Sequence, residues 1–275
     1  MKQGLRKLLE YLPDRTVLDE RPVFDEDISQ PFFHQGNRVG CLVLHGVGGT
    51  PANVRVLSDR LAAEGYTVFA PMLPGHGETV RALNASTGAE WLACALAGYE
   101  KLLAAGCQRI CPLGLSLGGL LAGLVAEERP CDGLVMICAP IKMRRFLQLA
   151  RLLSPVLPFA RYPSGGKSSS RQNNPYAQMY AGFSTLKLWD LTRLSRRLRR
   201  DLQKITCPAL WISAEYDDKV APVSFDIFRN GAVNAGEIRH VHMAESGHGC
   251  TYGRERERVA ALAADFLKSI GMGGE

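Results

Sequence analysis

The sequence predicts an α/β fold, with a mainly parallel sheet flanked by helices and a helical cap inserted into it. Short apolar runs rich in β-branched residues alternate with segments whose apolar residues recur every three or four positions. That alternation is typical of a buried parallel sheet with helices on both faces. It is interrupted once, and a chain of 275 residues with 46% hydrophobic content is large enough for one domain with an insertion.

Six apolar runs are predicted as strands. In chain order they cover residues 39–46, 66–71, 109–114, 133–140, 208–215 and 238–243. Each is short, continuous and bounded by turn residues, as expected for strands buried on both faces. Helical spacing predicts helices between and after them, over residues 51–65, 90–106, 115–130 and 254–270.

The N-terminal residues 1–14 are predicted to form a surface helix closed by Pro13. Arg6, Lys7 and Glu10 interrupt the apolar core that an export signal needs. No uncharged apolar run of about 18 residues occurs, so no membrane-spanning helix is expected.

The eight cysteines are scattered through apolar segments without the paired spacing of zinc sites. Reduced, buried thiols and a cytoplasmic location are therefore predicted.

The interval 141–204 differs from the rest of the chain in charge. It holds fourteen Lys plus Arg and two acidic residues, a net +12, whereas the other 211 residues carry 19 basic and 25 acidic groups, a net −6. No strand is predicted in it. We therefore expect a basic helical cap, or lid, at 141–204 and an α/β core formed by 1–140 and 205–275.

The predicted cap has three parts. The first is amphipathic, with one apolar face formed by Phe146, Leu149, Ala150 and Leu153. Residues 162–175 form a polar loop rich in glycine and serine that is expected to be mobile, and residues 184–205 form a strongly basic helix. We expect the cap to cover the carboxyl edge of the sheet, where ligands of open α/β sheets bind.

The stretch CPLGLSLGG places Ser116 where a predicted strand runs into a predicted helix. Gly-x-Ser-x-Gly at such a junction is typical of a nucleophile held on a tight, strained turn. Gly114 and Gly118 leave the space that this close backbone packing requires. The following helix directs amide groups toward a developing anion. Because the spacing alone is weak evidence, the interpretation depends on partners for the serine.

Candidate partners follow later strands. Serine needs a base, and the base needs a carboxylate that orients it and stabilises its protonated form. YDDKVAP follows the strand at 208–215, and ESGHG, with His248, follows the strand at 238–243. His248 lies in a glycine-flanked loop, which suits a base. His240 and His242 alternate with Val241 inside a strand, so we interpret them as packing or surface histidines.

The motifs VLHGVGGTP, APMLPGHGET, GLSLGG, YDDKVAP and ESGHG follow one another in an order and spacing that resemble those of α/β-hydrolase carboxylesterases. The chain resembles the small bacterial carboxylesterase and monoacylglycerol lipase-like branch of that superfamily. The resemblance spans residues 38–270, strong in both halves of the core and weak across the cap. It implies the α/β-hydrolase fold.

Residue by residue, the resemblance implies Ser116 as nucleophile, Asp217 as acid and His248 as base. Asp217 is preferred to Asp218 because the family's loop usually reads Asp-x-x-Val/Ile-x-Pro, which fits only the first of the two. Asp218 is interpreted as a solvated loop carboxylate, and Glu215 in the same way.

The resemblance also implies an oxyanion hole formed by the backbone N–H groups of Val47 and Leu117. Rigid backbone donors suit negative charge on a carbonyl oxygen. The family often has a bulky aromatic residue at the position of Val47, so a smaller side chain here implies more room beside the ester. His45 and His76, in neighbouring loops, are interpreted as structural.

The predicted function is a serine ester hydrolase that acts on a small-molecule ester, lipid-like or acidic, and needs no metal or organic cofactor. An acylglycerol lipase, amidase or acyltransferase with the same acyl-enzyme is a second interpretation, in which the cap contacts a lipid interface transiently. Its arginines could instead form only a solvated face.

A thiol nucleophile at Cys250 has no other support. A non-catalytic binding protein is disfavoured because all three catalytic residue types are present, and nucleic acid because the basic stretch has no aromatic residue beyond Trp189.

Overall fold

The computed structural model of the chain describes residues 18, 19, 24, 26–161 and 174–273. The predicted N-terminal helix and residues 162–173 of the predicted polar loop lie outside these ranges. No helix of the described part is long and apolar enough to cross a membrane.

A seven-stranded sheet forms the centre of the fold, with strand order β1-β3-β2-β4-β5-β8-β9. All neighbours pair in parallel except β1, which runs antiparallel to β3. The strands are β1 (Phe32–His34), β2 (Val39–Leu44), β3 (Thr67–Ala70), β4 (Arg109–Leu115), β5 (Leu134–Ile137), β8 (Ala209–Tyr216) and β9 (Ile238–Gly247). The predicted mainly parallel sheet is confirmed, and β1 is an edge strand that the sequence analysis missed.

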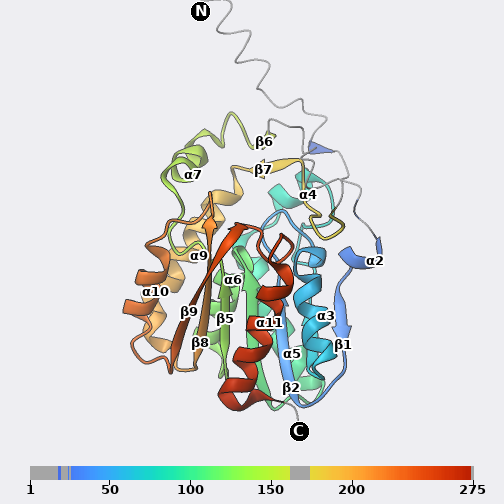
Figure 1. Cartoon of the computed structure of the whole chain (residues 1–275). Helices are drawn as coiled ribbons and strands as arrows, with labels where there is room; N and C mark the ends of the chain where they lie inside the picture. Colours follow the sequence, from blue (N-terminus) through green and yellow to red (C-terminus); the bar gives the residue numbers. More distant parts are fainter. Residues whose placement is uncertain (1–17, 20–23, 25, 162–173, 274–275) are drawn as a thin grey trace, which may run out of the picture.

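Helices cover both faces of the sheet (Figure 1). One face packs against α3 (Arg55–Ala63) and α11 (Arg256–Leu267), and the other against α5 (Gly88–Ala104), α6 (Leu117–Glu128) and α9 (Lys187–Asp201). Shorter helices are α2 (Glu26–Ser29), η2 (Pro51–Val54), α4 (Val80–Ala85), α10 (Ser224–Gly231) and η5 (Lys268–Met272). Two apolar clusters therefore fill the molecule, one on each side of the sheet.

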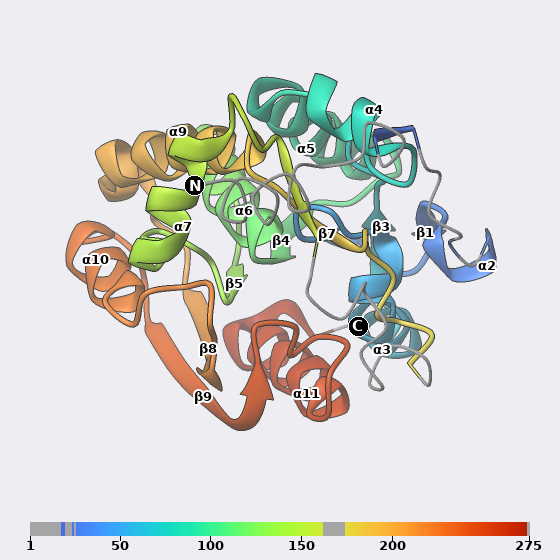
Figure 2. The ribbon, with the colours of Figure 1, turned by 90° about the horizontal axis from the view of Figure 1, so that it is seen from above.

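Residues 141–161 and 174–186 lie above the carboxyl ends of the strands, whereas α9 runs alongside the sheet with α5 and α6 (Figure 1, Figure 2). The described elements of the interval 141–204 are α7 (Arg145–Ala150), η3 (Arg151–Leu153), β6 (Phe159–Arg161), β7 (Gly182–Ser184), α9 and η4 (Leu202–Lys204). The expectation of no strand in this interval is wrong, because β6 and β7 pair antiparallel. Each spans only three residues, too short for an alternating pattern to be read from the sequence.

The helices α7 and α9 bury different amounts of their apolar faces. In α9, Leu188, Leu191, Leu194 and Leu198 are buried while the arginines face outward. In α7 only Leu147 is buried, while Phe146 and Leu149 of α7 and Leu153 of η3, predicted to share an apolar face, are exposed. The α7 region therefore presents apolar side chains to its surroundings.

Candidate active site

Ser116 lies at the tip of the turn between β4 and α6. Its backbone has φ 56° and ψ −115°, in the left-handed half of conformational space that a side chain rarely occupies. A Cβ added at Gly118 would lie 2.0 Å from the backbone oxygen of Leu44, and one at Gly114 would lie 2.2 Å from the backbone of Gly118. The two glycines are thus what allows this strained turn to pack against β2.

His248 and Asp217 reach Ser116 from loops at the ends of β9 and β8. The Ser116 hydroxyl donates to Nε2 of His248 at 2.9 Å, and Nδ1–H of His248 donates to Oδ2 of Asp217, also at 2.9 Å. Ser116 and Asp217 are buried and the His248 side chain is 20% exposed. The structure therefore brings together the three residues that the sequence placed far apart.

The Asp217 carboxylate has partners on both oxygens. Its Oδ1 accepts from the backbone N–H groups of Lys219 at 2.8 Å and Val220 at 2.9 Å. Burial raises the pKa of Asp217, but the hydrogen bond and charge of His248, together with these two amides, outweigh burial, so the pKa is lowered from its ordinary value. Asp218, by contrast, has a side chain 64% exposed that pairs with the Lys219 ammonium at 2.7 Å, at the rim of the cavity that Ser116 lines.

The two predicted oxyanion donors flank Ser116. Leu117 is the first residue of α6, so its N–H is among the amides that have no partner within the helix. Val47 lies in the loop after β2 and lines the same cavity as Ser116. The loop is held by buried His45, whose Nδ1–H donates to the Gly46 carbonyl at 2.9 Å and whose Nε2 accepts from the Leu73 amide at 3.1 Å.

His45 and His76 are fully buried and lie ring to ring, 5.0 Å between centroids. Burial lowers the pKa of His45 to about 4 and that of His76 to about 3. Both rings are therefore neutral near pH 7, and their backbone hydrogen bonds support the structural interpretation.

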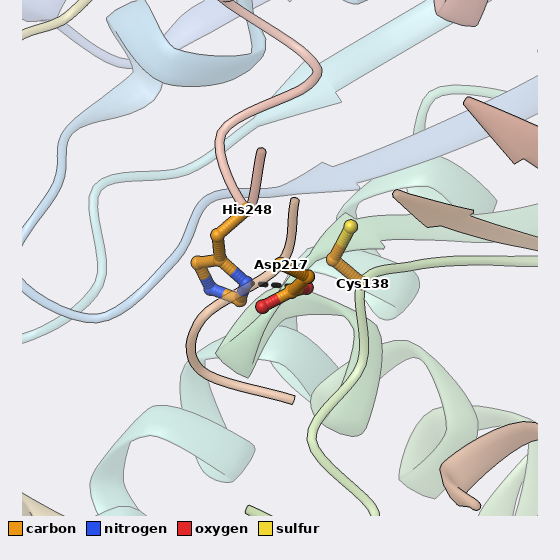
Figure 3. A group of neighbouring side chains, drawn as sticks. All are labelled: Cys138, Asp217 and His248. Atoms are coloured by element: carbon orange, nitrogen blue, oxygen red, sulfur yellow. Dashed lines mark hydrogen bonds and ion pairs between the residues drawn. The ribbon is translucent and has the colours of Figure 1, made fainter. Parts of the chain in front are cut away.

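Cys138 lies on the far side of Asp217 from His248 (Figure 3). Its thiol is 3.8 Å from that of Cys250, and both cysteines are buried. Cys138, Asp217 and His248 each offer a ligand atom within 4.8 Å of the others, a grouping that can hold a metal ion. A cation there would have to break the hydrogen bond between Asp217 and His248. The alternative nucleophile, Cys250, has no base beside it in this arrangement. Its thiol contacts Cys138, and the two ring nitrogens of His248 bond to Asp217 and Ser116.

A cavity of about 340 Å³ lies beside Ser116, lined mainly by apolar atoms. Part of its wall comes from the 141–204 interval, which contributes nine lining residues, among them Met143, Leu147 and Leu188. The helical spacing of the sequence predicted the helix of α9 but gave no signal for which of its side chains face the cavity. The sequence also gave no signal for the contact of Arg144 with the acid loop. Its guanidinium donates to the Asp217 carbonyl oxygen at 2.7 and 3.0 Å.

The chain is similar to two curated bacterial enzymes along nearly its whole length. It is 30% identical over 240 residues to the thermostable monoacylglycerol lipase of Bacillus sp. (strain H-257), covering 87% of this chain and 94% of that one. It is 29% identical over 242 residues to a carboxylesterase of Bacillus subtilis (strain 168), covering 88% and 97%.

Solved structures share the fold. One described with two metagenome-derived lipolytic enzymes, LipS and LipT, superposes with a TM-score of 0.80 at 26% identity, over 88% of this chain and 98% of that one. The monoacylglycerol lipase of Paleococcus ferrophilus superposes with a TM-score of 0.71 at 17% identity, over 87% and 98%, which supports the fold alone. The model of the alpha/beta hydrolase family matches residues 41–262. The chain therefore belongs to the alpha/beta hydrolase family.

Proposed function

We propose that the chain is a carboxylic ester hydrolase with Ser116 as nucleophile, His248 as general base and Asp217 as the residue that orients the base. The observation that carries the proposal is the continuous hydrogen bonding from the Ser116 hydroxyl through the His248 ring to Asp217, at the wall of a largely apolar cavity. Relatives named as a carboxylesterase and a monoacylglycerol lipase support esters as the substrate class.

In the proposed reaction, Ser116 Oγ attacks the ester carbonyl carbon while its proton passes to Nε2 of His248. The carbonyl electron pair moves to oxygen, and the tetrahedral intermediate collapses when His248 gives the proton to the departing alcohol. Water then attacks the acyl-enzyme, with its proton taken by the same nitrogen. The acid leaves, and the proton returns to Ser116. None of these steps calls on a metal or organic cofactor.

The negative charge of each intermediate is assigned to the backbone N–H groups of Val47 and Leu117. Such donors stabilise the transition state because they are fixed before charge develops, and loss of one costs about 10² to 10³ in rate. Leu117 adds the positive end of the α6 dipole. Asp217 stays ionised because of its lowered pKa, so it stabilises His248 when the ring is protonated.

The test is covalent labelling with a fluorophosphonate probe, beside hydrolysis of p-nitrophenyl butyrate. We expect labelling and turnover in the native protein and neither in Ser116→Ala. Cys250→Ser is the matched control for the thiol alternative and should keep both. Equal labelling of Ser116→Ala, or loss of labelling only in Cys250→Ser, would refute the assignment.

We further propose that residues 141–204 are a cap that supplies one wall of the substrate pocket. Its apolar lining, with the exposed side chains of α7, favours monoacylglycerols as a second candidate substrate. Rates on esters of increasing acyl length, with and without dispersed lipid, distinguish the candidates. Highest rates on long acyl chains at the interface support the lipase, and a sharp preference for short soluble esters excludes it.

The cytoplasm is the proposed location. All eight cysteines are free thiols and six of them are buried, which supports a reducing compartment. Thiol titration of freshly extracted protein, denatured without reductant, should give eight groups, and a lower number would contradict the proposal.

A further inference from the structure

Two histidines outside the Ser116 site point toward one place on the surface. His240 and His242 lie two residues apart in β9, so their side chains project from the same face of this edge strand. Both are exposed, whereas His45 and His76 are buried. β9 lies beside β8, with α10 close to the pair (Figure 1, Figure 2).

The two rings converge on the hydroxyl of Ser213, the residue of β8 paired with His242. The distance from Ser213 Oγ is 2.7 Å to Nε2 of His240 and 2.9 Å to Nδ1 of His242. A hydroxyl can donate to one ring and accept from the other. Two imidazole nitrogens are thus aimed at one small group that is able to rotate away.

Glu215 fixes the proton on His242. Its Oε2 lies 2.6 Å from Nε2 of His242, the nitrogen opposite the one that faces Ser213. Because a carboxylate accepts, Nε2 carries the proton and Nδ1 of the neutral ring presents its lone pair to Ser213. A carboxylate bound to the outer nitrogen of a histidine is the arrangement that orients metal-ligating histidines in proteins.

The His240 ring is held from the side by α10. Phe225 stacks on it with 4.0 Å between ring centroids and 29° between planes. Phe225 is itself packed against buried Trp211, at 5.9 Å between centroids. This stacking fixes the plane of the His240 ring while leaving its nitrogen edge free to contact Ser213.

From this convergence we propose that His240 and His242 form a surface site for a divalent transition-metal ion of the zinc, copper or nickel class. The ion would bind Nε2 of His240 and Nδ1 of His242 at about 2.0 to 2.1 Å for zinc, with water in its other positions. Imidazole is a preferred ligand of these ions. The Ser213 hydroxyl stays protonated and turns aside, and the Nε2 proton of His240 moves to Nδ1, so the ring remains neutral.

This site takes no part in ester hydrolysis. Its ligands come from the middle of β9 and contact Ser213 and Glu215 of β8, while His248 follows the end of the strand. The proposed metal site is therefore independent of the prediction that ester hydrolysis needs no metal. An ion joined to two positions of an edge strand stabilises the folded state by mass action, because the unfolded chain does not hold the pair in place.

The test is calorimetric titration of the full chain, prepared without a polyhistidine tag, with ZnCl₂ and with NiCl₂. We expect one saturable site in the native protein and retention on immobilised nickel. Affinity should fall about tenfold or more in Glu215→Ala, which removes the orienting carboxylate. His240→Ala/His242→Ala should lose the site, and Ser213→Ala should keep it.

Three controls make the outcome decisive. His34→Ala removes a partly exposed histidine of the opposite edge strand and should bind as the native protein does. Cys138→Ser removes a ligand of the competing group beside Asp217 and should also leave binding unchanged. All surface variants should hydrolyse p-nitrophenyl butyrate at the native rate, which shows that they fold. No saturable binding in the native protein, or binding that survives in His240→Ala/His242→Ala, would overturn the proposal.

Discussion

At the scale of single residues, the loop after β8 contains two adjacent carboxylates with different surroundings. Asp217 is buried and accepts from His248 and two backbone amides, whereas the Asp218 side chain is 64% exposed and pairs with Lys219. Only the former can hold His248 in the tautomer that accepts the serine proton. The amides of Lys219 and Val220 also keep the Asp217 carboxylate from rotating out of position.

We therefore predict that Asp217→Asn reduces kcat by about 10⁴, the scale seen when an orienting aspartate of a serine protease is replaced by asparagine. The amide would favour the wrong histidine tautomer while leaving the fold intact. Asp218→Asn, the matched control one residue away, should change kcat less than about threefold. The measurement is steady-state hydrolysis of p-nitrophenyl butyrate. Equal losses in both variants would assign the effect to the loop as a whole.

The sequence could predict these residues because their signals are local. Each of Ser116, Asp217 and His248 directly follows a strand, and motif spacing favoured Asp217, the aspartate that the structure places against His248. The thiol of Cys138 beside that carboxylate could not be predicted, because the contact depends on how the end of β5 approaches the loop after β8. Nor could the convergence of His240 and His242 on Ser213, since strand register decides it.

The buried pair of neutral histidines predicts acid sensitivity. Burial lowers the pKa of His45 from 6.5 to about 4 in the folded protein, so the unfolded chain binds a proton that the folded chain does not between these two values. The stability from this histidine is complete above pH 6.5 and is lost as pH falls toward 4, at about 1.4 kcal/mol per pH unit. His76 adds a loss of the same sign.

Urea unfolding between pH 7 and pH 4 measures the effect. In His45→Gln the amide can still donate to Gly46 and accept from Leu73, but it does not titrate. We expect its free energy of unfolding to fall less steeply with acid than that of the native protein. The difference in slope should correspond to at most one proton taken up on unfolding. Parallel curves for the two proteins would mean that His45 is accessible to protons in the folded state.

At the scale of elements, α9 is held to the core by a buried ion pair. Lys187 and Asp190 lie one turn apart, 3.0 Å between Nζ and Oδ2, with side chains 5% and 12% exposed. The Lys187 ammonium also donates to the Ser86 carbonyl, and Asp190 accepts from the Gly88 amide at 3.3 Å, at the start of α5. The pair thus joins the first turn of α9 to the first turn of α5.

We predict that Lys187→Met lowers the free energy of unfolding by about 3 kcal/mol or more, because it leaves the buried Asp190 carboxylate with only the more distant Arg193 as a cationic partner. Lys187→Met/Asp190→Leu should recover much of that loss, since replacing both charges with apolar groups removes the uncompensated one. Chemical denaturation of the two single variants and the double variant gives the coupling energy. Additive losses would show that the two side chains do not stabilise each other.

Elements differ in how well the sequence predicts them, and length is the reason. The six predicted strands and four predicted core helices occur within a few residues of their expected bounds, because each strand belongs to a continuous apolar run and each helix is long enough to show a period. β1, β6 and β7 have three residues each, and α10 is only eight residues long. Their existence depends on neighbouring strands and helices more than on their own pattern.

At the scale of the whole molecule, basic charge and exposed apolar surface occur in the same interval. The +12 of residues 141–204 contrasts with −6 elsewhere. Five of its apolar side chains, within eleven residues of sequence, are about half to two-thirds exposed: Phe146 49%, Leu149 64%, Leu152 57%, Leu153 51% and Val156 64%. The exposed Arg145 lies beside these side chains in sequence, and we propose that this stretch contacts an anionic lipid interface, where basic groups attract the headgroups and apolar side chains enter between them.

Substitutions on this surface test the hypothesis of a monoacylglycerol substrate separately from the hydrolysis reaction itself. Leu149→Gln/Leu152→Gln should lower the rate on monoacylglycerol dispersed in phosphatidylglycerol vesicles by about tenfold, because it removes apolar area that would be buried in the interface. Hydrolysis of soluble p-nitrophenyl butyrate should not change, since neither leucine lines the cavity beside Ser116. Val233→Gln, which replaces a side chain 70% exposed outside this interval, is the matched control and should act like the native protein on both substrates. A native rate of the double variant on vesicles would mean that the enzyme meets its substrate in solution, and that the arginines of the cap form a solvated face.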